Sequence, residues 1–207
     1  MKRLLVLLSV FMPMIVLAST FTAKVEDTKV FSSVSVQRLN SAGSLDFITT
    51  VPISLEGNFS FSDDVKTAEI YSLLFTTSNG QKSQQQVVLL SGENVIITYG
   101  LVYNMLGIKS VEGSENMKLL QQYQDESYKF SVFAGDAEKR HTEAKTPVEQ
   151  QAISQEFYNA MTAYHSRIKI LISNNTQLLA ASFIGYSEFS DSMVEAKSGI
   201  LKKVYET

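Results

Sequence analysis

Apolar and polar positions alternate along the first half of the chain, from Phe21 to about Val111. The clearest stretch places apolar side chains at every second position on either side of Gly57: Val51, Ile53, Leu55, Phe59 and Phe61. A period of two predicts a strand with one buried and one solvated face. Further strands are predicted around 30–36, 68–77, 86–90 and 95–99. Short strands separated by closely spaced turns indicate an antiparallel sandwich or a barrel-like sheet.

Proline and glycine mark the limits of these predicted strands. Pro52 has no amide hydrogen to donate, so its strand is expected at a sheet edge or to begin nearby. Gly57-Asn58 indicates either a tight turn or a bulge between two strand halves. Residues 91–94 (Ser-Gly-Glu-Asn) predict a turn that joins the strand around 86–90 to the strand around 95–99.

After Gly113 the apolar pattern changes to the period of a helix. Ser114 is a candidate N-cap, because its side chain can accept from the first free amides of a helix. The apolar residues that follow can line one side of that helix: Leu119, Leu120, Tyr123, Phe130 and Phe133. Residues 135–146 are polar enough to be an exposed connection or a frayed helix end.

Thr146, Pro147 and Glu149 together predict the start of a second helix, as N-cap, first-turn proline and capping-box acid. Its apolar stripe repeats at spacings of three and four: Ile153, Phe157, Met161, Tyr164, Ile168 and Leu171. Asn174-Asn175 is expected to end it. Thr176 can cap a short helix to about Tyr186, and 190–206 can form a last one.

These patterns predict an α+β fold, with an N-terminal antiparallel β-sandwich-like domain followed by a C-terminal group of about three to four helices. The predicted divisions are a signal peptide over 1–18, a β-rich accessory domain over 19–113 and a helical region over 114–207.

The N-terminus has the features of a secretory signal. Lys2-Arg3 precedes the apolar run Leu4–Ala18, and polar Ser19-Thr20 follows at once. A membrane-spanning helix needs about 20 apolar residues, which is more than this run supplies. We therefore expect cleavage after Ala18, no stable membrane span afterwards, and an exported protein in the periplasm or cell envelope.

Composition and charge exclude several classes of function. The 207 residues carry a formal charge of −3 and contain no basic block that could neutralise phosphates, which argues against nucleic acid as a partner. The chain contains no cysteine, so it forms no disulfide, thiolate metal site or Cys-x-x-Cys redox centre of its own. The core must hold the fold together unaided.

Candidate chemical sites are few, and each has a structural alternative. Four residues include metal-ligand types: Asp136, Glu138, His141 and Glu143. They lie among lysines and arginine, which is more typical of a solvated charged segment, and no HExxH spacing occurs. His165 beside Tyr164 is expected to flank the apolar stripe. We predict no catalytic, cofactor-binding or metal-binding residue and no cofactor.

Three further candidate sites are a turn, an aromatic face and the serines. The Gly113–Asn116 turn could bind an anion at a helix start, but a glycine turn and serine cap explain it with less, and Glu112 and Glu115 would repel an anion. Tyr71, Phe75, Tyr99 and Tyr103 could form an aromatic platform for a ligand, although burial in the core is the favoured interpretation. No serine lies in a Gly-x-Ser-x-Gly motif.

Three segments of the strand-rich half resemble a known family. They are SLEGNFSFSDDV (54–65), with a Gly-x-Phe-x-Phe hairpin; VVLLSGENVIIT (87–98), with a Gly-Glu turn; and VEGSENMKLLQQY (111–123), where Gly-Ser-x-Asn leads into a helix. Together they resemble the domain of unknown function 4369, a β-rich module of exported Bacteroidota proteins. NNTQLLAASFI (174–184) is similar to the linker that follows the module. The residues that carry the resemblance are structural: Gly57, Phe59, Phe61, Gly92, Gly113, Ser114 and Asn116.

In that family the module commonly precedes a thioredoxin-like domain of envelope thiol-disulfide oxidoreductases. The present sequence stops at Thr207 without such a domain, so we expect either a standalone module or the accessory part of a truncated oxidoreductase. The resemblance implies a non-catalytic accessory or interaction module, whose partner is an envelope thioredoxin-like protein or its client. The alternative is a binder of a small ligand, a sugar, peptide or lipid, in the cell envelope. An unrecognised hydrolase ranks last.

Overall fold

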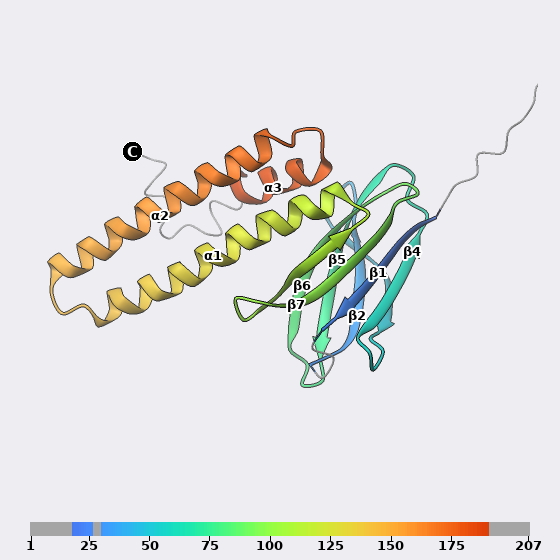
Figure 1. Cartoon of the computed structure of the whole chain (residues 1–207), viewed down its shortest axis with the longest axis horizontal. Coiled ribbons are helices and arrows are strands. Elements are labelled where there is room, and N and C mark those ends of the chain that lie inside the picture. Colours follow the sequence, from blue (N-terminus) through green and yellow to red (C-terminus); the bar gives the residue numbers. More distant parts are fainter. Residues whose placement is uncertain (1–17, 27–29, 191–207) are drawn as a thin grey trace, which may run out of the picture.

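The computed structural model describes residues 18–26 and 30–190, which form a two-sheet β-sandwich followed by three helices (Figure 1). The α+β class, with strands first and helices second, is therefore confirmed. Residues 1–17 of the predicted signal peptide and 191–206 of the predicted last helix lie outside the described residues.

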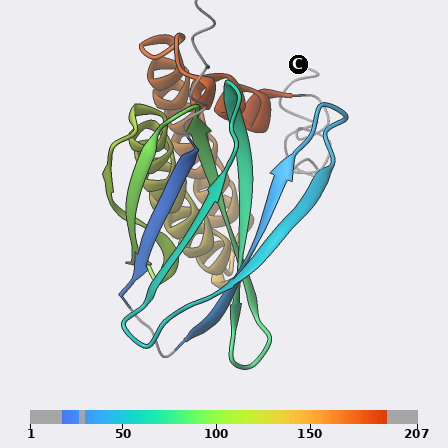
Figure 2. The ribbon, with the colours of Figure 1, turned by 90° about the vertical axis from the view of Figure 1, so that its right-hand side faces the viewer.

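Each sheet of the sandwich has four strands. The first contains, in spatial order, β4 (Asn58–Asp63), β1 (Ser19–Val25), β7 (Asn94–Val102) and β8 (Met105–Glu112). The second contains β3 (Leu45–Pro52), β2 (Phe31–Leu39), β5 (Ala68–Thr77) and β6 (Lys82–Leu90). All neighbours are antiparallel except β1 and β7, which run parallel with Phe21 opposite Val95. Figure 2 shows the sheets in front of the helices.

The core lies between the two sheets and is rich in aromatic rings. Alternate residues of β1 are buried, as a half-buried strand requires. Phe75 of β5 contacts two rings of the opposite sheet, Phe59 at 5.6 Å and Tyr99 at 5.1 Å between centroids. Phe61 lies 5.5 Å from Tyr71 in the same way. Edge and tilted ring contacts of this kind add to the apolar burial that holds the sheets together.

Two glycine turns carry the chain from one sheet to the other. Gly57 (φ +87°) lies between β3 and β4, and Gly92 (φ +72°) lies between β6 and β7. Because β3 and β4 belong to different sheets, the predicted hairpin at 54–65 is wrong. Of the two alternatives for Gly57-Asn58, the tight turn is correct, since Gly57 N donates to Ser54 O at 2.9 Å.

The turn also explains why Leu55 is 92 % exposed, although the apolar alternation predicts a buried strand position for it. Leu55 lies in the turn, so the strand ends before it even though the alternating pattern continues through it. Pro52 ends β3, which is an edge strand, so that prediction is confirmed.

The helical part consists of α1 (Glu115–Glu143), α2 (Pro147–Ser173) and the shorter α3 (Leu179–Phe189). α1 and α2 form an antiparallel hairpin that extends well beyond the sandwich (Figure 1). The predicted capping box is confirmed: Thr146 Oγ1 accepts from Glu149 N at 3.2 Å, and Glu149 Oε2 accepts from Thr146 N at 3.0 Å. In the described part of the chain, no helix has both the length and the apolar character needed to cross a membrane.

Two helix boundaries differ from the prediction. α1 continues to Glu143, so most of 135–146 is regular helix and not a connection. Within this stretch, Arg140 pairs with Asp136 one turn earlier (2.8 Å) and with Glu156 on α2 (2.9 Å). α3 begins at Leu179, where Leu178 occupies the cap position without a side-chain hydrogen bond, so Thr176 does not cap it.

Candidate functional site

Gly113, Ser114 and Asn116 lie where the chain passes from the last strand into α1. Gly113 has φ +82°, and a Cβ atom there would lie 2.0 Å from Asn94 O. Ser114 caps α1 by accepting from Met117 N. The buried Asn116 side chain accepts from Ala180 N at 3.0 Å and so joins α1 to the start of α3. Since Ser114 and Asn116 are buried and bonded within the chain, this turn is a structural junction and not an anion site.

The other motif residues also occupy structural positions. Phe59 and Phe61 are buried between the sheets, while Gly57 and Gly92 form the two turns between sheets. The polar groups at the two turns bond within the chain, since Ser19 Oγ accepts from Gly92 N at 3.0 Å and Ser54 Oγ accepts from Asn58 N at 3.1 Å. These motif residues therefore serve the local structure.

Three of the four aromatic residues that could have formed a ligand platform lie in the core. Tyr71, Phe75 and Tyr99 are fully buried, and Tyr103 lies in the turn between β7 and β8 with φ +51°. Burial raises the pKa of Tyr99 well above its usual range, in keeping with a neutral core hydroxyl. The core interpretation is correct for Tyr71, Phe75 and Tyr99 and wrong for Tyr103, which is 44 % exposed, so the four rings do not share one face.

Side-chain amides fix the base of α1 to the sandwich. Gln85 Nε2 on β6 donates to Leu106 O at 2.7 Å, and Gln124 Nε2 on α1 donates to Gln85 Oε1 at 2.6 Å. Gln124 Oε1 also accepts from Ile108 N on β8 at 2.7 Å. These bonds hold the hairpin at a defined angle to the sheets. The sequence analysis missed them, because glutamine inside an amphipathic pattern looks like an ordinary solvated residue.

A second polar cluster fixes α3 against the hairpin. Tyr123 on α1 donates to Glu188 Oε1 on α3 at 2.5 Å, and Ser127 lies 2.9 Å from the hydroxyl of Tyr164 on α2. Phe130 stacks on Tyr164 with ring centroids 4.8 Å apart. Burial, followed by the neighbouring Glu188, raises the pKa of Tyr123 well above its ordinary value. Through this cluster, α3 packs on the half of the α1–α2 hairpin that lies nearer the sandwich.

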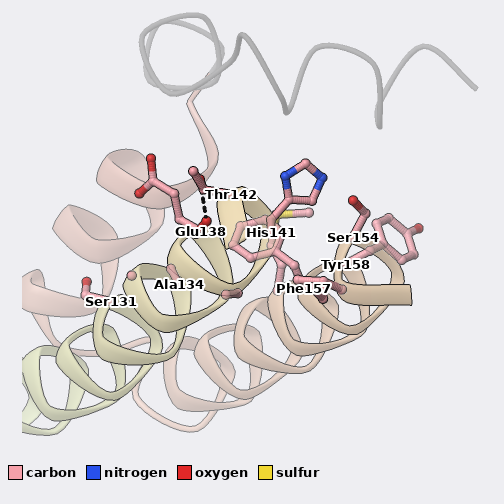
Figure 3. A pocket seen from close by; sticks show the side chains of 12 residues that line it. Ser131, Ala134, Glu138, His141, Thr142, Ser154, Phe157 and Tyr158 are labelled. Atoms are coloured by element: carbon pink, nitrogen blue, oxygen red, sulfur yellow. Dashed lines mark hydrogen bonds between the residues drawn. The ribbon is translucent and has the colours of Figure 1, made fainter. Parts of the chain in front are cut away.

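Beyond α3, the two long helices enclose an open groove of about 960 Å³, which we call the hairpin groove (Figure 3). α1 contributes mainly small and polar side chains: Ser131, Ala134, Gly135, Ala137, Glu138, His141 and Thr142. α2 contributes larger ones: Ile153, Ser154, Phe157, Tyr158 and Met161. Ile153, Phe157 and Met161 belong to the stripe predicted from spacing, which thus continues past the part covered by α3.

The candidate metal ligands lie along this stretch of α1 but are not gathered. Asp136 pairs with Arg140, and Glu143 lies 4.0 Å from Lys139. Glu138 and His141 instead stand on the rim of the hairpin groove (Figure 3). Among the described residues, no three His, Asp or Glu side chains are placed to share a metal ion. The groove offers an apolar floor with a polar rim, which suits binding by apolar contact.

A smaller hollow of about 610 Å³ lies where the turn between β2 and β3 approaches β5 and the start of α3. Its polar groups serve the local structure. Asn40 Oδ1 accepts from Ala42 N and Ser44 N, and Asn40 Nδ2 donates to Asp46 at 3.0 Å. This hollow is therefore a weaker candidate than the hairpin groove.

Comparison with known proteins identifies no family for the chain. No family model matches the sequence, and no curated protein matches it. A crystal structure of (S)-allantoin synthase is similar with a TM-score of 0.34 and 10 % identity, over 44 % of this chain and 42 % of that one. Sea bream transthyretin in complex with thyroxine gives 0.33 and 11 %, over 47 % and 96 %. The chain thus spans less than half of the allantoin synthase, and likenesses this low bear on neither fold nor function.

Proposed function

We propose that the chain is a non-catalytic, exported interaction module whose hairpin groove binds an amphipathic helix of another envelope protein. The observation that carries this proposal is the open apolar groove between α1 and α2, beyond the end of α3. Such grooves accept the apolar face of a helix through anchors at positions i, i+3, i+4 and i+7. The same hairpin already accepts one helix, α3, on the part nearer the sandwich.

The shape of the groove favours a helix. Small residues on α1, such as Ala134 and Gly135, allow a close approach, while Phe157 and Met161 on α2 provide large side chains to pack against. Ser131 to Thr142 covers eleven residue steps along α1, or about 16 Å at 1.5 Å per residue. This length accommodates about three helical turns.

Export and the identity of the partner come from the sequence. Lys2-Arg3 and the apolar run to Ala18 support a secretory signal. The resemblance to the domain of unknown function 4369 supports an envelope thioredoxin-like protein, or a client of one, as the partner. The absence of cysteine from the chain agrees with an accessory role in which the partner supplies any thiol chemistry.

The test is a crosslinked pull-down from envelope extract with matched groove variants. Ala134→Arg places a long charged side chain in the groove, and Val132→Arg places the same side chain at an exposed α1 position that does not line it. We expect wild type and Val132→Arg to recover a thioredoxin-like protein or its client, and Ala134→Arg to recover several-fold less. Equal recovery by all three, or no protein above background, would reject the proposed function.

A small apolar ligand is a second candidate for the same groove, because about 960 Å³ lies within the range of ligand sites. Glu138, Thr142 and His141 on the rim could orient its polar end. This candidate predicts saturable thermal stabilisation by a lipid or peptide that Ala134→Arg abolishes and Val132→Arg retains. A flat response of wild type across the ligand panel would remove it.

A further inference from the structure

The direction of α3 points the chain toward the hairpin groove. Ala180, near the start of α3, bonds to Asn116, and Glu188, near its end, bonds to Tyr123. α3 therefore runs along α1 in the same direction as α1 itself. The groove begins at Ser131, eight residues beyond Tyr123, which is about two turns farther along α1. The C-terminal end of α3 therefore points toward the groove.

The groove continues the surface that α3 covers. Near the sandwich, Tyr164 and Ile168 of α2 are buried beneath α3, whereas Ile153 and Phe157 of the same stripe are only half-buried. On α1, a Cβ atom added to Gly135 would have no described atom of another residue within 4 Å. The two helices therefore present one continuous apolar face, of which α3 occupies the nearer half.

The sequence continues past Ser190 with an amphipathic segment, residues 191–207, which lies outside the described part and enters here by its sequence alone. Apolar residues recur at spacings of three, four and four: Met193, Ala196, Ile200 and Val204. Glu195, Lys202 and Glu206 fall on the opposite side of a helical projection. Glu188 bonds to Tyr123, 65 residues earlier, and the same offset pairs Ile200 with Gly135, next to Ala134.

We propose that residues 191–207 occupy the hairpin groove of their own chain, with the Met193–Val204 stripe on the apolar floor and Ile200 near Ala134. Because the segment is tethered directly to α3, its effective concentration at the groove reaches the millimolar range. Binding of residues 191–207 in the groove of the free protein does not depend on whether a partner protein exists.

Paired cysteines in the full chain test this proposal, and the absence of native cysteine makes each introduced pair unique. Ala134→Cys with Ile200→Cys joins the groove floor to the stripe. Val132→Cys with Ile200→Cys is the control, because Val132 is exposed and does not line the groove. Disulfide formation is followed at high dilution by peptide mass spectrometry, with circular dichroism to establish that both variants melt like wild type.

We expect the Ala134–Ile200 pair to form an intramolecular disulfide about tenfold faster than the control pair. Ile200→Asp offers a second measurement: an environment-sensitive dye on a single Ala134→Cys should shift to a more polar emission when Ile200→Asp is added. Equal disulfide rates for both pairs would overturn the proposal. Exclusively intermolecular disulfides would also overturn it and would indicate a second copy in the groove. Either result leaves the partner pull-down to decide the proposed function separately.

Discussion

The phenolic oxygen of Tyr123 on α1 lies 2.5 Å from Glu188 Oε1 on α3, a bond between residues 65 apart in the sequence. Glu188 is almost fully buried. Because a buried carboxylate is costly unless donors surround it, this hydroxyl is part of what allows α3 to pack on the hairpin.

Tyr123→Phe removes that donor while keeping the ring. We expect the free energy of unfolding to fall by about 1–3 kcal/mol, since the buried Glu188 loses a hydrogen bond. Denaturant titration measures the change. The control is Tyr186→Phe on α3, the helix of Glu188, where the tyrosine is 68 % exposed and a negligible change is expected. Equal effects of the two variants would contradict the role of the Tyr123 bond.

Replacing Tyr99 or Tyr71 by phenylalanine is expected to change the free energy of unfolding in opposite directions. The Tyr99 hydroxyl is buried without a hydrogen-bond partner among the described residues, so Tyr99→Phe is expected to raise the free energy of unfolding by about 1 kcal/mol. Tyr71 donates to Asp63 at 2.8 Å, and Tyr71→Phe is expected to lower it by about 1–3 kcal/mol. Urea midpoints of the two variants would decide, and a loss of stability in Tyr99→Phe would be the contrary result.

Gly113 and Gly135 form a second matched pair. Gly113→Ala should destabilise the chain by at least about 1–3 kcal/mol, because φ is +82° and the new Cβ would meet Asn94 O. Gly135→Ala, inside α1 with open space around it, should stabilise by about 0.5–1 kcal/mol through helix propensity. Thermal melts compare them, and effects of the same sign would refute the argument.

The capping box predicts a specific pH dependence. Backbone amides of Thr146 and Lys145 that donate to Glu149 lower the pKa of its carboxyl below the ordinary 4.5. The ionised carboxylate of Glu149 is thus favoured in the folded state. Its contribution to the free energy of unfolding is full above pH 4.5 and is lost as the pH falls through the folded-state pKa.

Glu149→Gln should therefore lose stability relative to wild type near neutral pH and match it more closely in acid. Denaturant titrations at about pH 7 and about pH 3 measure the two differences. A deficit that stays constant across this range would show that the charge of Glu149 contributes nothing. Glu143→Gln, at the exposed end of α1, serves as the control.

Only one of the two walls of the hairpin groove could be predicted from the sequence. The α2 stripe from Ile153 to Leu171 was predicted from spacing, and the structure places Ile153 and Phe157 in the groove wall. For the opposite wall on α1, the sequence predicts an exposed connection or a frayed helix end, because Gly135 and the charged residues after it weaken the helical pattern. This stretch is regular helix in the folded chain, where Arg140 pairs with Asp136 and Glu156, and the second of these pairs exists only once α2 packs beside α1.

The sequence by itself determined the order of elements, the start of α2, the edge position of Pro52 and the division into a strand-rich and a helical part. These features depend on local periods and on capping chemistry, which short stretches of chain contain in full. Only the tertiary structure decided that the Gly57 and Gly92 turns cross between sheets, that Leu55 faces solvent, and that Asn116 and Tyr123 hold α3. The exposure of Leu55 follows from the local turn at Gly57, but the other features depend on contacts between residues far apart in the chain, and no local pattern encodes which distant partner a strand, turn or side chain will meet.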